Sequence, residues 1–148
     1  MTIAVYYYTR SGNTEKLAKA IAEELGVHAL SISSATERKA DVTFLGTSPY
    51  AFDIDPAVKK FIEENHENLG TLVCFGTSAS GMSTHKKVKL LAERLGVPVL
   101  EEHFNCPGHF AFMHKSRPNE EDVAAACVFA QRALALIKST QTEDETHA

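Results

Sequence analysis

A short polar segment near the N-terminus combines small hydroxyl side chains with one glycine and one arginine, Thr9-Arg10-Ser11-Gly12-Asn13-Thr14. It follows the β-branched and aromatic run Ile3–Tyr8 and precedes apolar residues at helical spacing, so we place it between a strand and a helix. The first N–H groups of a helix can bind an anion, and a glycine allows close approach of the backbone. The segment therefore predicts a phosphate site, with Arg10 as a nearby positive charge. The alternative is that these residues only cap the helix.

Other phosphate-binding patterns do not fit the chain. It contains neither G-x-G-x-x-G nor G-x-x-x-x-G-K-[ST], and the second strand ends in Ser31-Ile32-Ser33-Ser34 without a carboxylate for a ribose. A response-regulator receiver would need carboxylates after the first and third strands. This chain has Tyr8-Thr9 and Thr47 at those places, which excludes that reading.

Strand and helix patterns alternate along the whole chain. Short apolar runs such as Val42–Gly46 and Leu72–Phe75 predict buried strands, and Val97–Phe104 predicts a fifth strand in which Pro98 must lie near the start or at an edge. Asp55-Pro56 and Asn119 predict the starts of two helices. This alternation is typical of a parallel sheet covered on both faces, in which ligands bind beyond the carboxyl ends of the strands.

Composition limits the class of protein. The chain has 148 residues, 44% of them hydrophobic and 23% charged, with a net charge of −4, so we expect a globular domain and no nucleic-acid partner. The apolar run Val123–Ile137 is too short for a membrane span, and three scattered cysteines argue against disulfides. We expect a cytoplasmic protein with no membrane partner, folded over residues 1–139 and disordered over the polar tail 140–148.

The pattern Thr9-x-Ser11-Gly12-Asn13-Thr14 resembles the phosphate signature of flavodoxins, and the order of elements resembles a short-chain flavodoxin over nearly the whole length. The resemblance implies a three-layer α/β fold with a doubly wound, five-stranded parallel sheet of order 2-1-3-4-5. It also implies bound FMN, one-electron transfer, and contacts to the FMN phosphate from Thr9, Arg10, Ser11, Gly12, Asn13 and Thr14.

Two later loops would then surround the flavin ring. The residues implied are Thr47, Ser48, Pro49 and Tyr50 in one loop and Thr77, Ser78, Ala79, Gly81 and Met82 in the other. Tyr50 stands where flavodoxins carry an aromatic residue stacked on the ring. An aromatic side chain suits this place because it gives the planar flavin ring a planar apolar cover. The alternative is that Tyr50 or Phe52 closes the edge of the core.

The second of these loops departs from the flavodoxin pattern. Residues 76–83 carry neither the usual acidic residue nor a second tyrosine, which leaves one face of the ring open. Two functions follow from the resemblance. The first is an electron carrier that exchanges electrons with larger redox partner proteins and needs no catalytic side chain. The alternative is an FMN-dependent reductase that acts on a small acceptor at the open face.

Cys106 lies in the sequence among His103, His109 and His114. One cysteine and three histidines on a loop match no closed zinc pattern, so we predict no metal site. No second cysteine lies near enough in sequence to resolve an oxidised Cys106, which argues against a redox role for its thiol.

Overall fold

The computed structural model describes residues 1–34, 38–109 and 116–147. Five parallel strands form one sheet in the order β2-β1-β3-β4-β5, which confirms the predicted fold and strand order. In chain order the elements are β1 Ile3–Tyr7, α1 Asn13–Leu25, β2 Ala29–Ser31, β3 Val42–Thr47, α2 Pro56–Asn65, β4 Thr71–Ser78, α3 His85–Arg94, β5 Phe104–Pro107 and α4 Glu120–His147. Short 3-10 turns at Ile32–Ser34 and His66–Asn68 follow β2 and α2.

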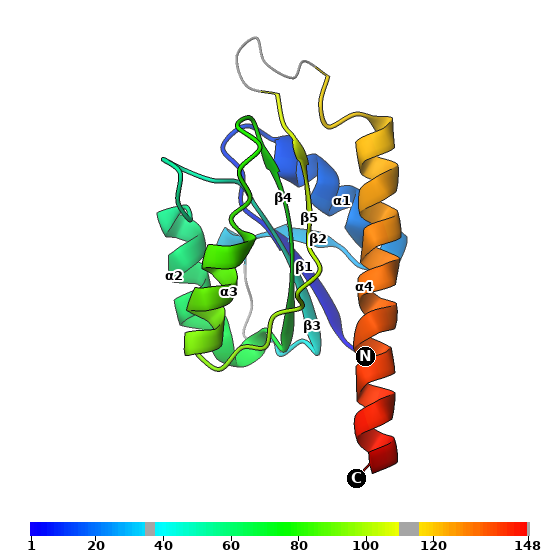
Figure 1. The fold of residues 1–148 in the computed structure, drawn as a ribbon. Coiled ribbons are helices and arrows are strands. Elements are labelled where there is room, and N and C mark those ends of the chain that lie inside the picture. The colour runs from blue at the N-terminus through cyan, green and yellow to red at the C-terminus, as the bar shows by residue number, and fades with distance from the viewer. Residues whose placement is uncertain (35–37, 110–115, 148) are drawn as a thin grey trace.

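Two hydrophobic cores lie on opposite faces of this sheet. Helices α1 and α4 cover one face, and α2 and α3 cover the other (Figure 1). Every residue of β3 is buried, as expected for a central strand with helices on both sides. Phe44 and Leu45, neighbours on β3, belong to different cores because successive side chains of a strand point to opposite faces.

The helix starts agree with the sequence at two places. Asp55 caps α2, its carboxylate accepting the Ala57 N–H at 3.0 Å, and Pro56 is the first helical residue. Asn119 caps α4 by accepting the Asp122 N–H at 2.9 Å, and the Asp122 carboxylate accepts the Asn119 N–H at 2.8 Å. Both are side-chain caps of the kind that the residue types predict.

The fifth strand begins later than predicted. Val99 forms only an isolated bridge with Leu72, and the regular pairing with β4 starts at Phe104. Proline has no N–H to donate, and here Pro98 uses its carbonyl to accept the Leu72 N–H at 2.8 Å. The segment before Phe104 therefore touches the sheet without forming a strand.

The last helix is longer than the sequence predicts. Where a disordered tail is expected from residue 140, α4 continues to His147 and extends beyond the sheet (Figure 1). The Thr140 and Thr142 hydroxyls donate to the carbonyls of Leu136 and Lys138, four residues earlier, as hydroxyl side chains within a helix do. Ala148 lies outside the described residues.

Part of α4, Glu120–Thr142, is long and apolar enough to cross a membrane by length and composition alone. The core helix of a globular domain passes the same test. One side of α4 is buried in the core against α1 and the sheet, through Ala126, Ala130, Ala133, Leu134 and Ile137.

Candidate functional site

The segments that follow β1, β3, β4 and β5 all lie at one edge of the sheet (Figure 1). Because the strands are parallel, their carboxyl ends meet at this edge, where a doubly wound sheet binds its ligands. The three loops predicted from the sequence are therefore brought together.

The first loop, residues 9–14, runs from the end of β1 into the first turn of α1. Gly12, the residue before α1, has φ 89° and has no side chain with which to cap the helix. The Gly12 N–H donates to Thr9 Oγ1 at 2.8 Å, and the Asn13 N–H is 3.5 Å from Ser11 Oγ. None of the described residues would come within 4 Å of a Cβ added at Gly12, so the space above the loop is open. This helix start can receive an anion.

Thr14 lies deeper than the rest of the first loop. Its side chain is fully buried, and its hydroxyl is 3.0 Å from the Thr77 hydroxyl at the end of β4. Gly46 on β3 makes this approach possible, because a Cβ there would lie 2.8 Å from Thr14 Cγ2 and 2.4 Å from the Phe75 ring. The hydroxyl of Thr14 thus joins the first loop to the third.

Arg10 belongs to the first loop in sequence, but its side chain reaches the second. Its Nε donates to Asp55 Oδ2 at 2.8 Å, and the guanidinium carbon lies 4.1 Å from the centre of the Tyr50 ring. The hydrogen bond to Asp55 raises the pKa of Arg10. The structure therefore places Arg10 beside Tyr50.

The second loop contains a tight turn with an exposed tip. Tyr50 and Asp53 exchange two backbone hydrogen bonds, of 2.9 and 3.0 Å, and the two residues between them, Ala51 and Phe52, have φ of 50° and 61°. Positive φ at both central positions is unusual for residues with a Cβ and is found where the surroundings hold the backbone. Lys87 of α3 does so, donating to the Phe52 carbonyl at 3.0 Å and lying 3.3 Å from Asp53.

The remaining residues of this loop vary in exposure. Thr47 is buried, Ser48 and Pro49 are half-buried, and Tyr50 is 47% exposed. Phe52 is 74% exposed at the tip of the turn, so it does not close the edge of the core. Of the two aromatic side chains, Tyr50 is the one held beside the first loop.

The third loop is built from small residues. Ser78 is buried, and its hydroxyl is 3.1 Å from that of Ser80, which accepts the Met82 N–H at 3.3 Å. Gly81 has φ 83°, and no described residue would come within 4 Å of a Cβ there. Ala79 and Met82 are half-buried. Space beside this loop is therefore open.

A fourth segment, which sequence reasoning did not assign to the site, joins it after β5. The Asn13 amide donates to the His109 carbonyl at 2.9 Å, and the Gly108 N–H donates to the Ser78 carbonyl at 3.3 Å. A Cβ at Gly108 would lie 2.9 Å from the Asn13 amide nitrogen and 3.1 Å from Thr77 Cβ, so a larger residue here would displace the Asn13 side chain. The Pro107-Gly108 pair is the sequence signal that could have marked a loop at the end of β5.

Charged groups fix the far end of this segment. Arg117 binds the Asp122 carboxylate with two hydrogen bonds, of 2.6 and 2.7 Å, and thereby lowers the pKa of Asp122. Lys16 of α1 donates to the Pro118 carbonyl at 2.5 Å. The start of α4 is thus tied to α1 next to the first loop.

The described members of the cysteine and histidine group, Cys106, His103 and His109, form no metal-binding cluster. Cys106 is buried, and burial raises the pKa of its thiol to about 11, which disfavours the reactive thiolate. His103 instead stacks on His85, the ring centres 4.0 Å apart. Among the residues that the structure describes, no three His, Cys, Asp or Glu side chains could hold a metal ion, and His114 lies outside them.

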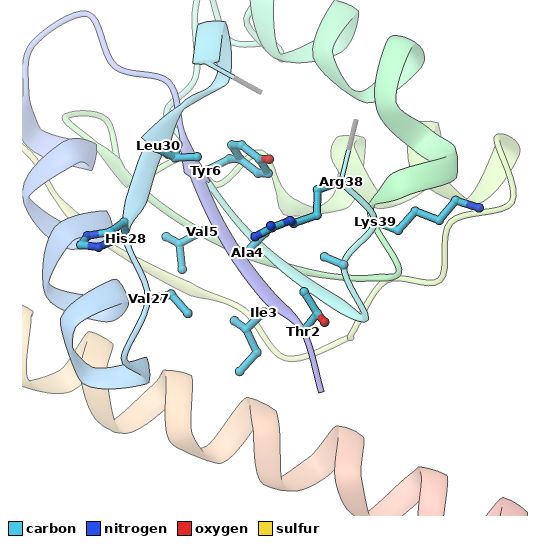
Figure 2. A pocket seen from close by; sticks show the side chains of 11 residues that line it. Thr2, Ile3, Ala4, Val5, Tyr6, Val27, His28, Leu30, Arg38 and Lys39 are labelled. Atoms are coloured by element: carbon cyan, nitrogen blue, oxygen red, sulfur yellow. The ribbon is translucent and has the colours of Figure 1, made fainter. Parts of the chain in front are cut away.

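Two cavities lie away from the first loop. One, of about 590 Å³, is bordered by β1, β2 and residues 38–40, and Figure 2 shows Arg38 lying across β1 beside Ala4. The other, of about 850 Å³, lies between Ile32 and α2. The described part of the connection from β2 to β3 contains no α-helix, only the 3-10 turn Ile32–Ser34. Neither cavity is lined by residues 9–14.

A family model described as a flavodoxin domain matches residues 4–120 of the chain. The chain belongs to the flavodoxin family. This membership supports a flavin-binding function of the flavodoxin type.

The similarity of this flavodoxin-family chain to known proteins covers most of its length. An uncharacterised protein of Methanocaldococcus jannaschii is 25% identical over 146 residues, covering 89% of this chain and 97% of that protein. A flavodoxin from the domain Archaea has a TM-score of 0.74 and 18% identity, and the match covers 93% of this chain and 99% of that one. The rubredoxin oxygen:oxidoreductase of Desulfovibrio gigas has a TM-score of 0.67 and 16% identity, over 90% of this chain but only 36% of that one.

The residues present fit a flavin mononucleotide at two points. The uncapped start of α1, with open space above Gly12, fits a terminal phosphate. Tyr50, half-exposed beside this loop, fits a planar ring. The two points lie in neighbouring loops, since the Arg10 guanidinium of the first loop lies 4.1 Å from the Tyr50 ring of the second.

Proposed function

We propose that this chain binds FMN at the carboxyl edge of its sheet and carries single electrons between redox partner proteins in the cytoplasm. The observation that carries the proposal is the open, uncapped start of α1 after Gly12, next to a half-exposed aromatic ring. A terminal phosphate fits such a helix start, which favours FMN over a flavin without one.

The chain's own residues would bind and orient the cofactor, which would supply the electron chemistry when bound. Backbone N–H groups of residues 11–14, with the hydroxyls of Thr9 and Ser11, would surround the phosphate, which would replace these two hydroxyl oxygens as the acceptor of the Gly12 and Asn13 N–H groups. Tyr50 would cover one face of the ring, and the small residues at 77–82 would let the backbone approach its edge. None of these roles requires a side chain that transfers a proton.

Charge near the ring would affect the reduction potential. The described third loop carries no carboxylate, so nothing in it opposes the negative charge that the ring gains on reduction. We therefore expect full reduction to be easier than in a flavodoxin with an acidic residue in this loop.

One observation favours a second function. The space beside Gly81 is open, and the third loop has no aromatic side chain to fill it. Open space beside a cofactor can admit a small substrate. A small acceptor could be reduced there, which would make the protein an FMN-dependent reductase.

The two functions differ in what the purified protein does alone. In one sample the bound cofactor is released by heat and identified by its mass. In a second sample the intact holoprotein is reduced stepwise while its visible spectrum is recorded. A carrier should release FMN and take up its two electrons in separate steps. It should also fail to turn over with NAD(P)H and a quinone until a reductase is added.

Two results would contradict this proposal. Failure of the purified chain to bind FMN at micromolar concentrations would exclude FMN binding of any functional value. Steady turnover with NAD(P)H and a small acceptor, with no protein partner present, would exclude the carrier and establish the reductase.

A further inference from the structure

Arg10 is anchored in the second loop although it lies in the first. Its guanidinium makes two hydrogen bonds to Asp55, Nε to Oδ2 at 2.8 Å and Nη2 to Oδ1 at 3.4 Å. The Asp55 side chain is only 3% exposed, and its Oδ1 also accepts the Ala57 N–H that begins α2. The carboxylate thus caps a helix and holds Arg10 at the same time.

The same guanidinium lies over an aromatic ring. Its carbon is 4.1 Å from the centre of the Tyr50 ring and 5.8 Å from that of Tyr8. A planar guanidinium stacks well on an aromatic face and is attracted by its electrons. One face of Tyr50 is therefore covered by Arg10, while 47% of the residue stays exposed.

The turn that carries Tyr50 is held at its other end as well. Lys87 donates to the Phe52 carbonyl at 3.0 Å and pairs with Asp53 at 3.3 Å. The N–H of Ile54 and then Lys87 lower the pKa of Asp53, since both stabilise its charged form. Two cations from different elements thus fix the Tyr50 turn.

We propose that Arg10 is a positioning residue that holds the Tyr50 ring ready for the flavin, and that it does not bind the phosphate. The inference rests on the proposed function and refines it. Tyr50 would cover the isoalloxazine with the face that Arg10 leaves uncovered. A ring that is already in place loses little freedom when the ligand binds, which strengthens binding.

The alternative is that Arg10 turns to the phosphate when FMN arrives. That movement would leave the Asp55 carboxylate, buried at the start of α2, without its cationic partner. Loss of two hydrogen bonds at this 3% exposed carboxylate is unfavourable because water reaches it poorly, although the Arg10 side chain is itself 55% exposed. The backbone N–H groups of the first loop can receive the phosphate without such a loss.

Comparison of FMN with riboflavin, which lacks the phosphate, separates the two roles. Apo-protein is titrated with each flavin, and the quenching of flavin fluorescence gives both dissociation constants. The variants are Arg10→Gln and Arg10→Lys, each also made together with Tyr50→Ala. Ser11→Ala, in the same loop, is the matched control for loss of a phosphate contact. Circular dichroism of each apo-variant shows whether it is folded.

We expect Arg10→Gln to weaken FMN and riboflavin by the same factor, about two- to fivefold for a partly exposed stacking contact. Arg10→Lys should also weaken both flavins by the same factor, because an ammonium cannot lie flat on the Tyr50 ring. An ammonium would still bind a phosphate, so a phosphate role for Arg10 would be largely kept in this variant. In the Tyr50→Ala background neither change should have a further effect. Ser11→Ala should weaken FMN more than riboflavin.

Two outcomes would overturn the positioning role while leaving FMN binding intact. A loss of affinity for FMN alone in Arg10→Gln would make Arg10 a phosphate ligand. An undiminished effect in the Tyr50→Ala background would show that Arg10 does not act through Tyr50. If the wild-type chain bound neither flavin, the proposed function would fail, and the positioning role with it.

Discussion

Replacing Thr14 with valine tests whether the first and third loops are joined by a buried hydroxyl pair. Thr14 is fully buried, its hydroxyl is 3.0 Å from that of Thr77, and Thr77 is itself only 2% exposed. Valine keeps the shape but removes the hydroxyl, so the Thr77 hydroxyl loses this partner in a place with little access to water. A buried polar group left unpaired costs about 1–3 kcal/mol.

We expect Thr14→Val to lower the free energy of unfolding by about 1–2 kcal/mol, since the added methyl group offsets part of that loss. For a chain of this length, each kcal/mol lowers Tm by roughly 2–4 °C. The double variant Thr14→Val/Thr77→Val should lose less than the sum of the two single variants, because no hydroxyl is then left unpaired. The difference should be about 1 kcal/mol.

Urea unfolding of the apo-protein, followed by circular dichroism, measures all four members of this cycle. Additive losses, or a Thr14→Val protein as stable as the wild type, would refute the hydroxyl pair. FMN titration of the same proteins tests the other role that the sequence suggested for Thr14. Unchanged stability with at least a tenfold loss of FMN affinity would assign its hydroxyl to the phosphate.

Two further predictions concern packing and pH. Gly46→Ala should destabilise the protein by about 1–3 kcal/mol in urea unfolding, because the new Cβ would lie 2.4 Å from the Phe75 ring, and unchanged stability would contradict this packing. Burial lowers the pKa of His85 below its ordinary value of 6.5, although the hydrogen bond to the Leu100 carbonyl and the nearby Glu101 act in the opposite direction. Because this pKa is lower in the folded state, the unfolded chain binds more protons as the pH falls through 6.5. The stability that neutral His85 contributes should therefore be complete above that pH and decrease below it. The decrease in Tm between about pH 7 and pH 5 should be smaller in His85→Gln than in the wild type. Equal decreases in the two proteins would contradict the prediction.

The sequence predicted the elements well where a local pattern determines them. Asp55-Pro56 and Asn119 mark helix starts because capping depends on residues only two or three positions apart. The order of the strands came from a resemblance to a family, since periodicity alone does not say which strands are neighbours. The predicted start of the fifth strand was wrong, because the apolar run that contains Pro98 resembles a strand in sequence but forms only one isolated bridge with β4.

The connections within the site could not be predicted, because their partners are far apart in the chain. Arg10 and Asp55 are 45 residues apart, and Asn13 and His109 are 96 apart. A basic residue in a phosphate loop suggests a phosphate ligand when only the loop is considered. Its orientation toward Asp55 depends on the fold, which brings the start of α2 beside the first loop.

Cross-connections between loops determine what surface is left for a ligand. Thr14, Arg10 and Asn13 leave the first loop toward the third loop, the second loop and the segment after β5, respectively. The longer polar side chains of the first loop are thereby engaged in bonds between loops. What remains beside the open spaces at Gly12 and Gly81 is mainly backbone and small hydroxyl groups. Such a surface would bind a phosphate and the edge of a ring by dipoles and shape. Among the described residues of the first and third loops it presents no carboxylate or histidine that could transfer a proton to a substrate. A cofactor held in this way can exchange electrons, but it receives little help from the protein with proton-dependent chemistry, and for this reason we favour the carrier over the reductase.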